Sequence, residues 1–288
     1  MGNPVACTGW HNRPMLIGLL LCDHVAPEVI HSVSGDYDRL FADLLGAVDP
    51  AHRFESVDVI GGDLPSDPTS VDAWLLTGSR HSVTDDADWI IDLAAWVAET
   101  HRAARVPMMG ICFGHQMLAH ALGGVVQRHE GGWGVGIRSL ELAGPSVAPG
   151  ADRFDLIHLH QDQVTTLPPA ARRVGSSAHC LNAAIEFGTG VDRASVGKTA
   201  SAGETASAGE TTGGMASVIT GSSIGVQAHP EFTVDYARAI LESRRERIGG
   251  TVADEALATL DERVDEGLGV ARWLCDHVAA AGALRRRS

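Results

Sequence analysis

The first 124 residues alternate short apolar runs with longer segments of helical periodicity. Turn-forming residues bound each run, and the longer segments repeat apolar side chains every three or four positions, as amphipathic helices do. This alternation is typical of parallel strands joined by crossover helices. It predicts strands over residues 15–22, 55–62, 73–79 and 106–112, and helices over residues 37–48, 88–104 and 115–124.

The pattern changes after Gly131. Short strand-like pieces follow one another there, which predicts an antiparallel or mixed layer packed on the same core. These pieces lie at residues 134–142, 154–164, 173–180, 183–188, 216–221 and 224–232, and helical periodicity returns over residues 234–250 and 253–283. We therefore predict an α/β fold with a mostly parallel central sheet flanked by helices, a smaller antiparallel layer and a C-terminal helical extension.

A low-complexity segment interrupts the second half. The hexapeptide TASAGE occurs at residues 199–204 and again at residues 205–210. Its small, polar and acidic residues cannot bury enough apolar surface to fold alone, so we interpret residues 192–216 as a loop insert that lengthens a hairpin, with a regulatory lid as the alternative. One domain is predicted over residues 14–240, followed by a helical extension over residues 241–288.

Charge and cysteine usage narrow the classes of function. The chain carries 22 basic and 36 acidic residues, a formal charge of −14, so a nucleic-acid partner is not expected, and Arg285, Arg286 and Arg287 are interpreted as a basic tail. No apolar run approaches the roughly 18 residues that a membrane span requires. Five separated cysteines without a C-x-x-C spacing, and a start without a secretory signal, favour a reducing cytoplasm. No metal and no cofactor are expected.

The segment GICFG places Cys112 between Gly110 and Gly114, at the junction of an expected strand and an expected helix. A sharp strand-to-helix turn requires a strained residue with small neighbours, as in nucleophile elbows. The N-terminus of the following helix favours a thiolate over a thiol. Cys112 is therefore a candidate nucleophile, and a cysteine buried for packing is the alternative.

A nucleophile of this kind needs a base and a group that orients the base. The segment GVQAHPEF offers both, with His229 at the end of an expected strand and Glu231 two residues later. Pro230 between them fixes its φ angle and stiffens the pair. A simple exit from the strand would explain His-Pro-Glu equally well, but its coincidence with the Cys112 segment favours a catalytic role.

Together, the segments GICFGHQMLAHALGG and GVQAHPEF closely resemble the two signatures of the class I (triad-type) glutamine amidotransferase family. The resemblance extends over about residues 16–235 and implies a flavodoxin-like fold. It also implies roles for three residues: Cys112 as the nucleophile, His229 as the general base and then acid, and Glu231 as the carboxylate that orients His229.

The same resemblance implies an oxyanion hole. The segment LLTGSRHSV resembles the one that supplies the first N–H, at Gly78, and the backbone N–H of Phe113 would supply the second. Two such amides stabilise a developing oxyanion. Relatives usually have proline after that glycine, where this chain has Ser79 and Arg80.

Three further residues are implied to line the substrate pocket. Gln116 matches the glutamine that helps to hold the amino-acid end of the substrate. His160 and Asp162, in the segment HQDQV, match residues that line the same pocket. Because His158 and His160 lack helical i,i+4 pairing with an acidic residue, a metal role for them is not expected.

The resemblance implies hydrolysis of a γ-glutamyl amide, glutamine to glutamate and ammonia, through a cysteine thioester. The chain is most similar to the stand-alone branch that resembles the amidotransferase part of GMP synthetase, and it has no P-loop or adenylating signature. The ammonia acceptor is therefore expected on a separate synthetase or acceptor-binding subunit, or is absent. Two alternatives remain: a hydrolase of γ-glutamyl peptides or γ-glutamyl amines, and a catalytically silent regulatory subunit.

Overall fold

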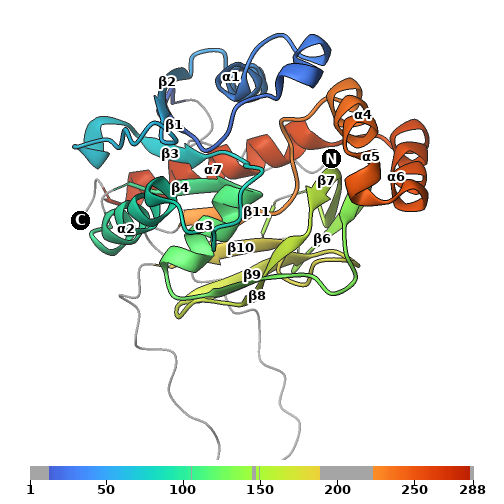
Figure 1. Cartoon of the computed structure of the whole chain (residues 1–288). Helices are drawn as coiled ribbons and strands as arrows, with labels where there is room; N and C mark the ends of the chain where they lie inside the picture. Colours follow the sequence, from blue (N-terminus) through green and yellow to red (C-terminus); the bar gives the residue numbers. More distant parts are fainter. Residues whose placement is uncertain (1–12, 105, 145–146, 149, 189–222, 286–288) are drawn as a thin grey trace, which may run out of the picture.

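The computed structural model describes residues 13–104, 106–144, 147–148, 150–188 and 223–285. Its centre is a nine-stranded sheet in the order β2-β1-β3-β4-β11-β10-β9-β6-β7 (Figure 1). The first five strands in this order run parallel, and each of the others is antiparallel to its neighbours. The strands of this sheet are β1 (Leu16–Leu21), β2 (Arg53–Asp58), β3 (Ala73–Leu76), β4 (Met108–Ile111), β6 (Gly134–Leu142), β7 (Arg153–His160), β9 (Ala171–Ser176), β10 (Ala184–Phe187) and β11 (Ser223–Val226).

Helices cover both faces of the parallel part of the sheet. Helices α1 and α7 share one hydrophobic core with the sheet, and α2 and α3 share the core on the opposite face. Helices α4, α5 and α6 stand together at the end of the sheet, where α6 packs on β6 (Figure 1). The helices are α1 (Tyr37–Val48), α2 (Asp88–Arg102), α3 (Phe113–Ala121), α4 (Val234–Ser243), α5 (Arg245–Ile248), α6 (Gly250–Glu262) and α7 (Gly267–Arg285).

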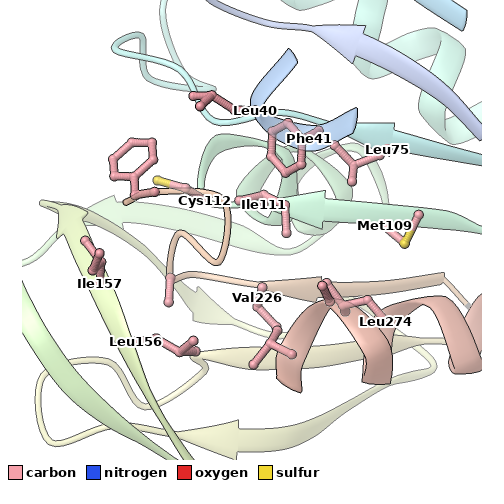
Figure 2. Close-up of a cluster of buried hydrophobic side chains, with 14 of the residues drawn as sticks. Leu40, Phe41, Leu75, Met109, Ile111, Cys112, Leu156, Ile157, Val226 and Leu274 are labelled. Atoms are coloured by element: carbon pink, nitrogen blue, oxygen red, sulfur yellow. The ribbon is translucent and has the colours of Figure 1, made fainter. Parts of the chain in front are cut away.

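The sequence of strand β4 is continuously apolar because the strand is buried on both faces. Met108 points into the α2–α3 core, whereas Met109 and Ile111 point into the α1–α7 core, because successive side chains of a strand face opposite sides. In the α1–α7 core, Ile111 lies near Phe41 of α1 (Figure 2). Cys112 follows Ile111 at the end of the strand, so a strand that is fixed on both faces positions it.

The predicted α/β class is confirmed. The antiparallel strands continue the central sheet instead of forming a layer on top of it, because β10 pairs with the free edge of β11. The single strand expected over residues 154–164 is two strands: the chain leaves β7 at Gln161 and enters β8 (Asp162–Thr166), which pairs with β5 (Val125–Arg128) in a second sheet. Strand β5 was not expected, since only one of its four residues is buried.

Helices α5, α6 and α7 follow the end of α4, and residues 263–266 between α6 and α7 are not helical. Helix α7 packs against α1 and against β4, β7 and β11, so this segment helps to cover the central sheet. The whole predicted 192–216 insert with its TASAGE repeat, the strand expected at 216–221, and Arg286 and Arg287 lie outside the described residues. In the part of the chain that the structure describes, no helix is long and apolar enough to cross a membrane.

Candidate active site

Cys112 occupies a strained turn between β4 and α3. Its φ of +50° and ψ of −99° lie outside the regions that L-residues favour, a conformation that costs of order 1–3 kcal/mol. Three backbone hydrogen bonds hold the turn: the Cys112 N–H donates to the Val226 oxygen at 2.9 Å, the Gly114 N–H to the Thr77 oxygen at 3.2 Å, and the Gln116 N–H to the Cys112 oxygen at 3.0 Å. The neighbouring strands therefore impose the strained conformation and maintain it.

The two glycines beside Cys112 allow close backbone packing. A Cβ atom on Gly110 would lie 2.5 Å from the Gly114 oxygen, and one on Gly114 would overlap the backbone oxygen of Leu76. Neither position has space for a methyl group. The short spacing of glycines around the cysteine thus has a steric cause, and the turn presses α3 against the ends of β3 and β4.

His229 and Glu231 form a buried pair three to five residues after β11 ends. Their side chains are 5% and 0% exposed, and Nδ1 of His229 lies 2.8 Å from Oε1 of Glu231. The His229 ring stacks on Phe232 with a centroid distance of 4.1 Å, and its backbone N–H donates to the Ile157 oxygen at 2.8 Å. Because Glu231 engages Nδ1, the other ring nitrogen is left to act on a partner.

The charge state of His229 depends on Cys112. Burial alone would lower the pKa of the imidazole, but the charges of Cys112 and Glu231, and the hydrogen bonds to both, raise that pKa to about 10. The sulfur of Cys112 and the carboxylate of Glu231 therefore both favour the protonated form of His229. By contrast, burial raises the thiol pKa of Cys22, Cys180 and Cys275 to about 12, so these three remain protonated.

Gly78 lies against both His229 and Cys112. A Cβ atom at Gly78 would be 2.9 Å from Cε1 of His229 and 3.8 Å from Cβ of Cys112. Phe113 is the first residue of α3, and the first N–H groups of a helix have no partner within that helix. The backbones of Gly78 and Phe113 thus flank Cys112, one from the loop after β3 and one from the helix start.

The loop after Gly78, in which relatives usually have proline, is fixed by a buried carboxylate. Asp23, 6% exposed, accepts a hydrogen bond from the Arg80 backbone N–H at 2.8 Å and from Arg80 Nε at 2.9 Å. The same guanidinium donates to the His24 oxygen at 2.8 Å. Ser79 and Arg80 therefore do not leave the loop unconstrained, since contacts with the end of β1 replace the rigidity of a proline.

A buried relay of amides joins Gln116 to the sulfur. Nε2 of Gln116 donates to the Asp162 oxygen at 2.7 Å and to Oε1 of Gln227 at 3.1 Å. Nε2 of Gln227 in turn lies 3.5 Å from Sγ of Cys112 as a donor. Sequence reasoning missed Gln227, although alternation along the expected strand puts it on the same face as His229.

A pocket of about 180 Å³ opens above Cys112. Gln116, His160 and Asp162 line it together with Cys112, whereas His229 and Glu231 are not part of its wall. Burial lowers the pKa of His160 well below its ordinary value, so this ring is neutral. Among the residues that the structure describes, no three histidine, cysteine or acidic side chains are grouped to hold a metal ion.

The fold and this site define a class of α/β proteins in which a cysteine at a strand-to-helix turn meets a buried histidine and a carboxylate from a neighbouring strand. The family model for "Glutamine amidotransferase class-I" matches residues 63–244. The chain belongs to this family of enzymes. The match includes Gly78, Cys112, His229 and Glu231.

Individual relatives agree with this assignment. Gamma-glutamyl peptidase 2 of Arabidopsis thaliana is 30% identical over 161 residues, which cover 53% of this chain and 63% of the peptidase, less than two thirds of that protein. A glutamine-hydrolysing GMP synthase of Lactococcus lactis is 32% identical over 114 residues, 39% of this chain and 21% of the synthase. A solved glutamine amidotransferase of Thermotoga maritima shares the fold, with a TM-score of 0.64 and 19% identity over 92% of this chain and 98% of that one.

Proposed function

We propose that this protein hydrolyses a γ-glutamyl amide bond through a thioester on Cys112, with glutamine as the first candidate substrate. The observation that carries the proposal is the pairing of a strained, helix-capping cysteine with the buried His229–Glu231 pair. A cysteine beside a buried histidine can pass its proton to the imidazole and attack as a thiolate. Membership in the amidotransferase family and the similarity to a γ-glutamyl peptidase support the same chemistry.

The reaction would proceed in two stages. The Cys112 sulfur attacks the side-chain carbonyl carbon, the N–H groups of Gly78 and Phe113 bind the resulting oxyanion, and His229 gives its proton to the leaving nitrogen as the C–N bond breaks. Water then enters, His229 takes one of its protons, and the hydroxide attacks the thioester. The carbon–sulfur bond breaks, which releases glutamate and restores Cys112. Glu231 keeps His229 in the required orientation throughout.

Two assignments around this chemistry are also proposals. Gln116, His160 and Asp162, which line the pocket, would contact the amino-acid end of the glutamyl group. If the ammonia is used in a synthesis, a separate synthetase or acceptor-binding subunit would receive it. We also expect the protein to act in the cytoplasm. A silent regulatory subunit is disfavoured, because such a protein would have no reason to keep two ionisable side chains buried at the end of β11.

The test is an assay of the full chain with glutamine and with γ-glutamyl dipeptides, followed by mass spectrometry after treatment with a glutamine-mimicking electrophile. We expect turnover and a covalent adduct on Cys112, and both should disappear in Cys112→Ala. The buried Cys180 provides the control, since Cys180→Ala should keep both signals. Turnover that persists in a folded Cys112→Ala protein would refute the proposal.

A further inference from the structure

The wall of the active-site pocket carries a local excess of positive charge. Four arginines line it, while the lining carboxylates are those of Asp85 and Asp162. The chain as a whole has a formal charge of −14, so this excess runs against the overall balance. The lining arginines are Arg80, Arg128, Arg244 and Arg247.

Two of these arginines have acidic partners in the protein. Arg80 pairs with Asp23 at 2.9 Å, and Nε of Arg128 lies 3.7 Å from the Asp162 carboxylate. Arg80 in particular is held away from any ligand by its hydrogen bonds to Asp23 and to the His24 oxygen. The positive charge available to a substrate therefore resides mainly on the other two.

Arg244 and Arg247 lie three residues apart at the junction of α4 and α5, which places them on one face of the helical segment. In the described part of the chain, neither forms an ion pair within 4.0 Å. The guanidinium of Arg247 stacks over the ring of Trp133, 5.4 Å from its centroid, and Trp133 also lines the pocket.

Their neighbour Arg245 behaves differently. It does not line the pocket, and it makes two hydrogen bonds to Asp254, at 2.6 and 2.7 Å. Arg245 thus has an acidic partner, whereas no pocket carboxylate lies within 4.0 Å of Arg244 or Arg247 in the described part of the chain. Arg244 and Arg247 thus line the pocket without an ion pair among the described residues, and Trp133 packs against Arg247 there.

We propose that Arg244 and Arg247 bind a carboxylate on the leaving half of the substrate, so that the substrate is a γ-glutamyl amino acid or a short γ-glutamyl peptide. This inference rests on the proposed γ-glutamyl hydrolysis. Arginine binds carboxylates through paired N–H donors, which makes it selective for that group. Glutamine has a single carboxylate, on the amino-acid end that Gln116, His160 and Asp162 would contact, so its leaving half offers nothing to the two guanidinium groups, whereas a γ-glutamyl amino acid brings a second carboxylate.

The experiment compares two substrates with the same acyl group and leaving groups of similar size. γ-Glutamylglycine carries the second carboxylate, and γ-glutamylglycinamide replaces it with a neutral amide. We expect wild-type protein to have a kcat/KM roughly tenfold higher for γ-glutamylglycine, and we expect added salt to reduce this preference. Arg244→Gln/Arg247→Gln should bring the ratio close to one, and the single variants should give intermediate ratios.

Arg245→Gln is the matched control, because it removes the same charge from the same segment on the side of Asp254. It should keep the wild-type ratio. A wild-type ratio near one would overturn the inference while leaving γ-glutamyl hydrolysis intact, as would an equal loss on both substrates in the double variant, since the arginines would then serve the glutamyl half. Absence of turnover of every γ-glutamyl substrate, together with absence of Cys112 labelling, would refute the proposed function itself.

Discussion

Replacing Gly78 with alanine adds one methyl group where the loop after β3 meets the catalytic candidates. The backbone φ of Gly78 is not positive, so alanine can adopt its conformation. The new Cβ would lie 2.9 Å from Cε1 of His229, well inside the 3.5–4.0 Å separation at which carbon atoms pack without repulsion. Alanine keeps the backbone N–H of residue 78, so the substitution tests the close spacing between this loop and His229.

The size of the effect follows from this contact. His229 or the loop must move by about 0.6 Å to relieve it, and the stacked Phe232 together with the 2.8 Å contact to Glu231 resists any movement of the ring. A misplacement of 1 Å costs roughly 100-fold in rate, so we expect kcat to fall about tenfold. The added crowding should lower the free energy of unfolding by about 1 to 2 kcal/mol, too little to unfold the protein.

Steady-state hydrolysis of the best γ-glutamyl substrate, with urea unfolding of the same samples, measures both quantities. Gly46→Ala is the control, since a Cβ there has no atom within 4 Å and the residue lies in α1. It should leave kcat unchanged and stabilise the protein by about 0.5 to 1 kcal/mol. Wild-type kcat in a folded Gly78→Ala protein would refute the position assigned to His229.

Three further predictions concern the residues around the site. Gly114→Ala should cost at least about 2 kcal/mol in urea unfolding, because its Cβ would overlap the Leu76 oxygen, and a cost below that of Gly78→Ala would contradict the packing described for the turn. Glu231→Gln should lower the pKa of His229 from about 10, seen by NMR of labelled histidine, and reduce kcat about 100-fold; an unmoved pKa would exclude Glu231 as its charge partner. Burial raises the pKa of Asp265 from 3.8 to about 6, so the folded state binds this proton more tightly than the unfolded state does. The resulting stabilisation of about 3 kcal/mol is complete below pH 3.8 and is lost as the pH rises through 6. The free energy of unfolding of Asp265→Asn should therefore rise relative to that of wild type, by about this amount, as the pH increases from below 4 to 7. A difference that stays constant with pH would contradict the shift.

Local patterns in the sequence were sufficient to predict the helices and strands whose stabilising interactions lie within the element itself. The helix predicted over residues 37–48 is α1, with the same bounds, because its apolar spacing and the side-chain cap by Asp36 both lie within the segment. The parallel orientation of the first strands follows from their short apolar runs and the helices between them. The strand-to-helix position of Cys112 was predictable for the same reason, since Gly110, Gly114 and the flanking periodicity are neighbours in the chain.

Contacts between distant segments decided the rest. The chain leaves the central sheet at Gln161 because β8 pairs with β5 in the second sheet. Gln227 belongs to the site because α3 brings Gln116 within 3.1 Å of it. Residues 234–250 predict a helix from their spacing, but spacing cannot say that Arg244 and Arg247 face a pocket while Arg245 faces Asp254. The sequence by itself determined most of the elements and the candidate nucleophile, because these depend on interactions within a few residues. Only the tertiary structure decided which charges surround that nucleophile, because those charges come from separate segments, and Arg244 and Arg247 lie more than a hundred residues further along the chain.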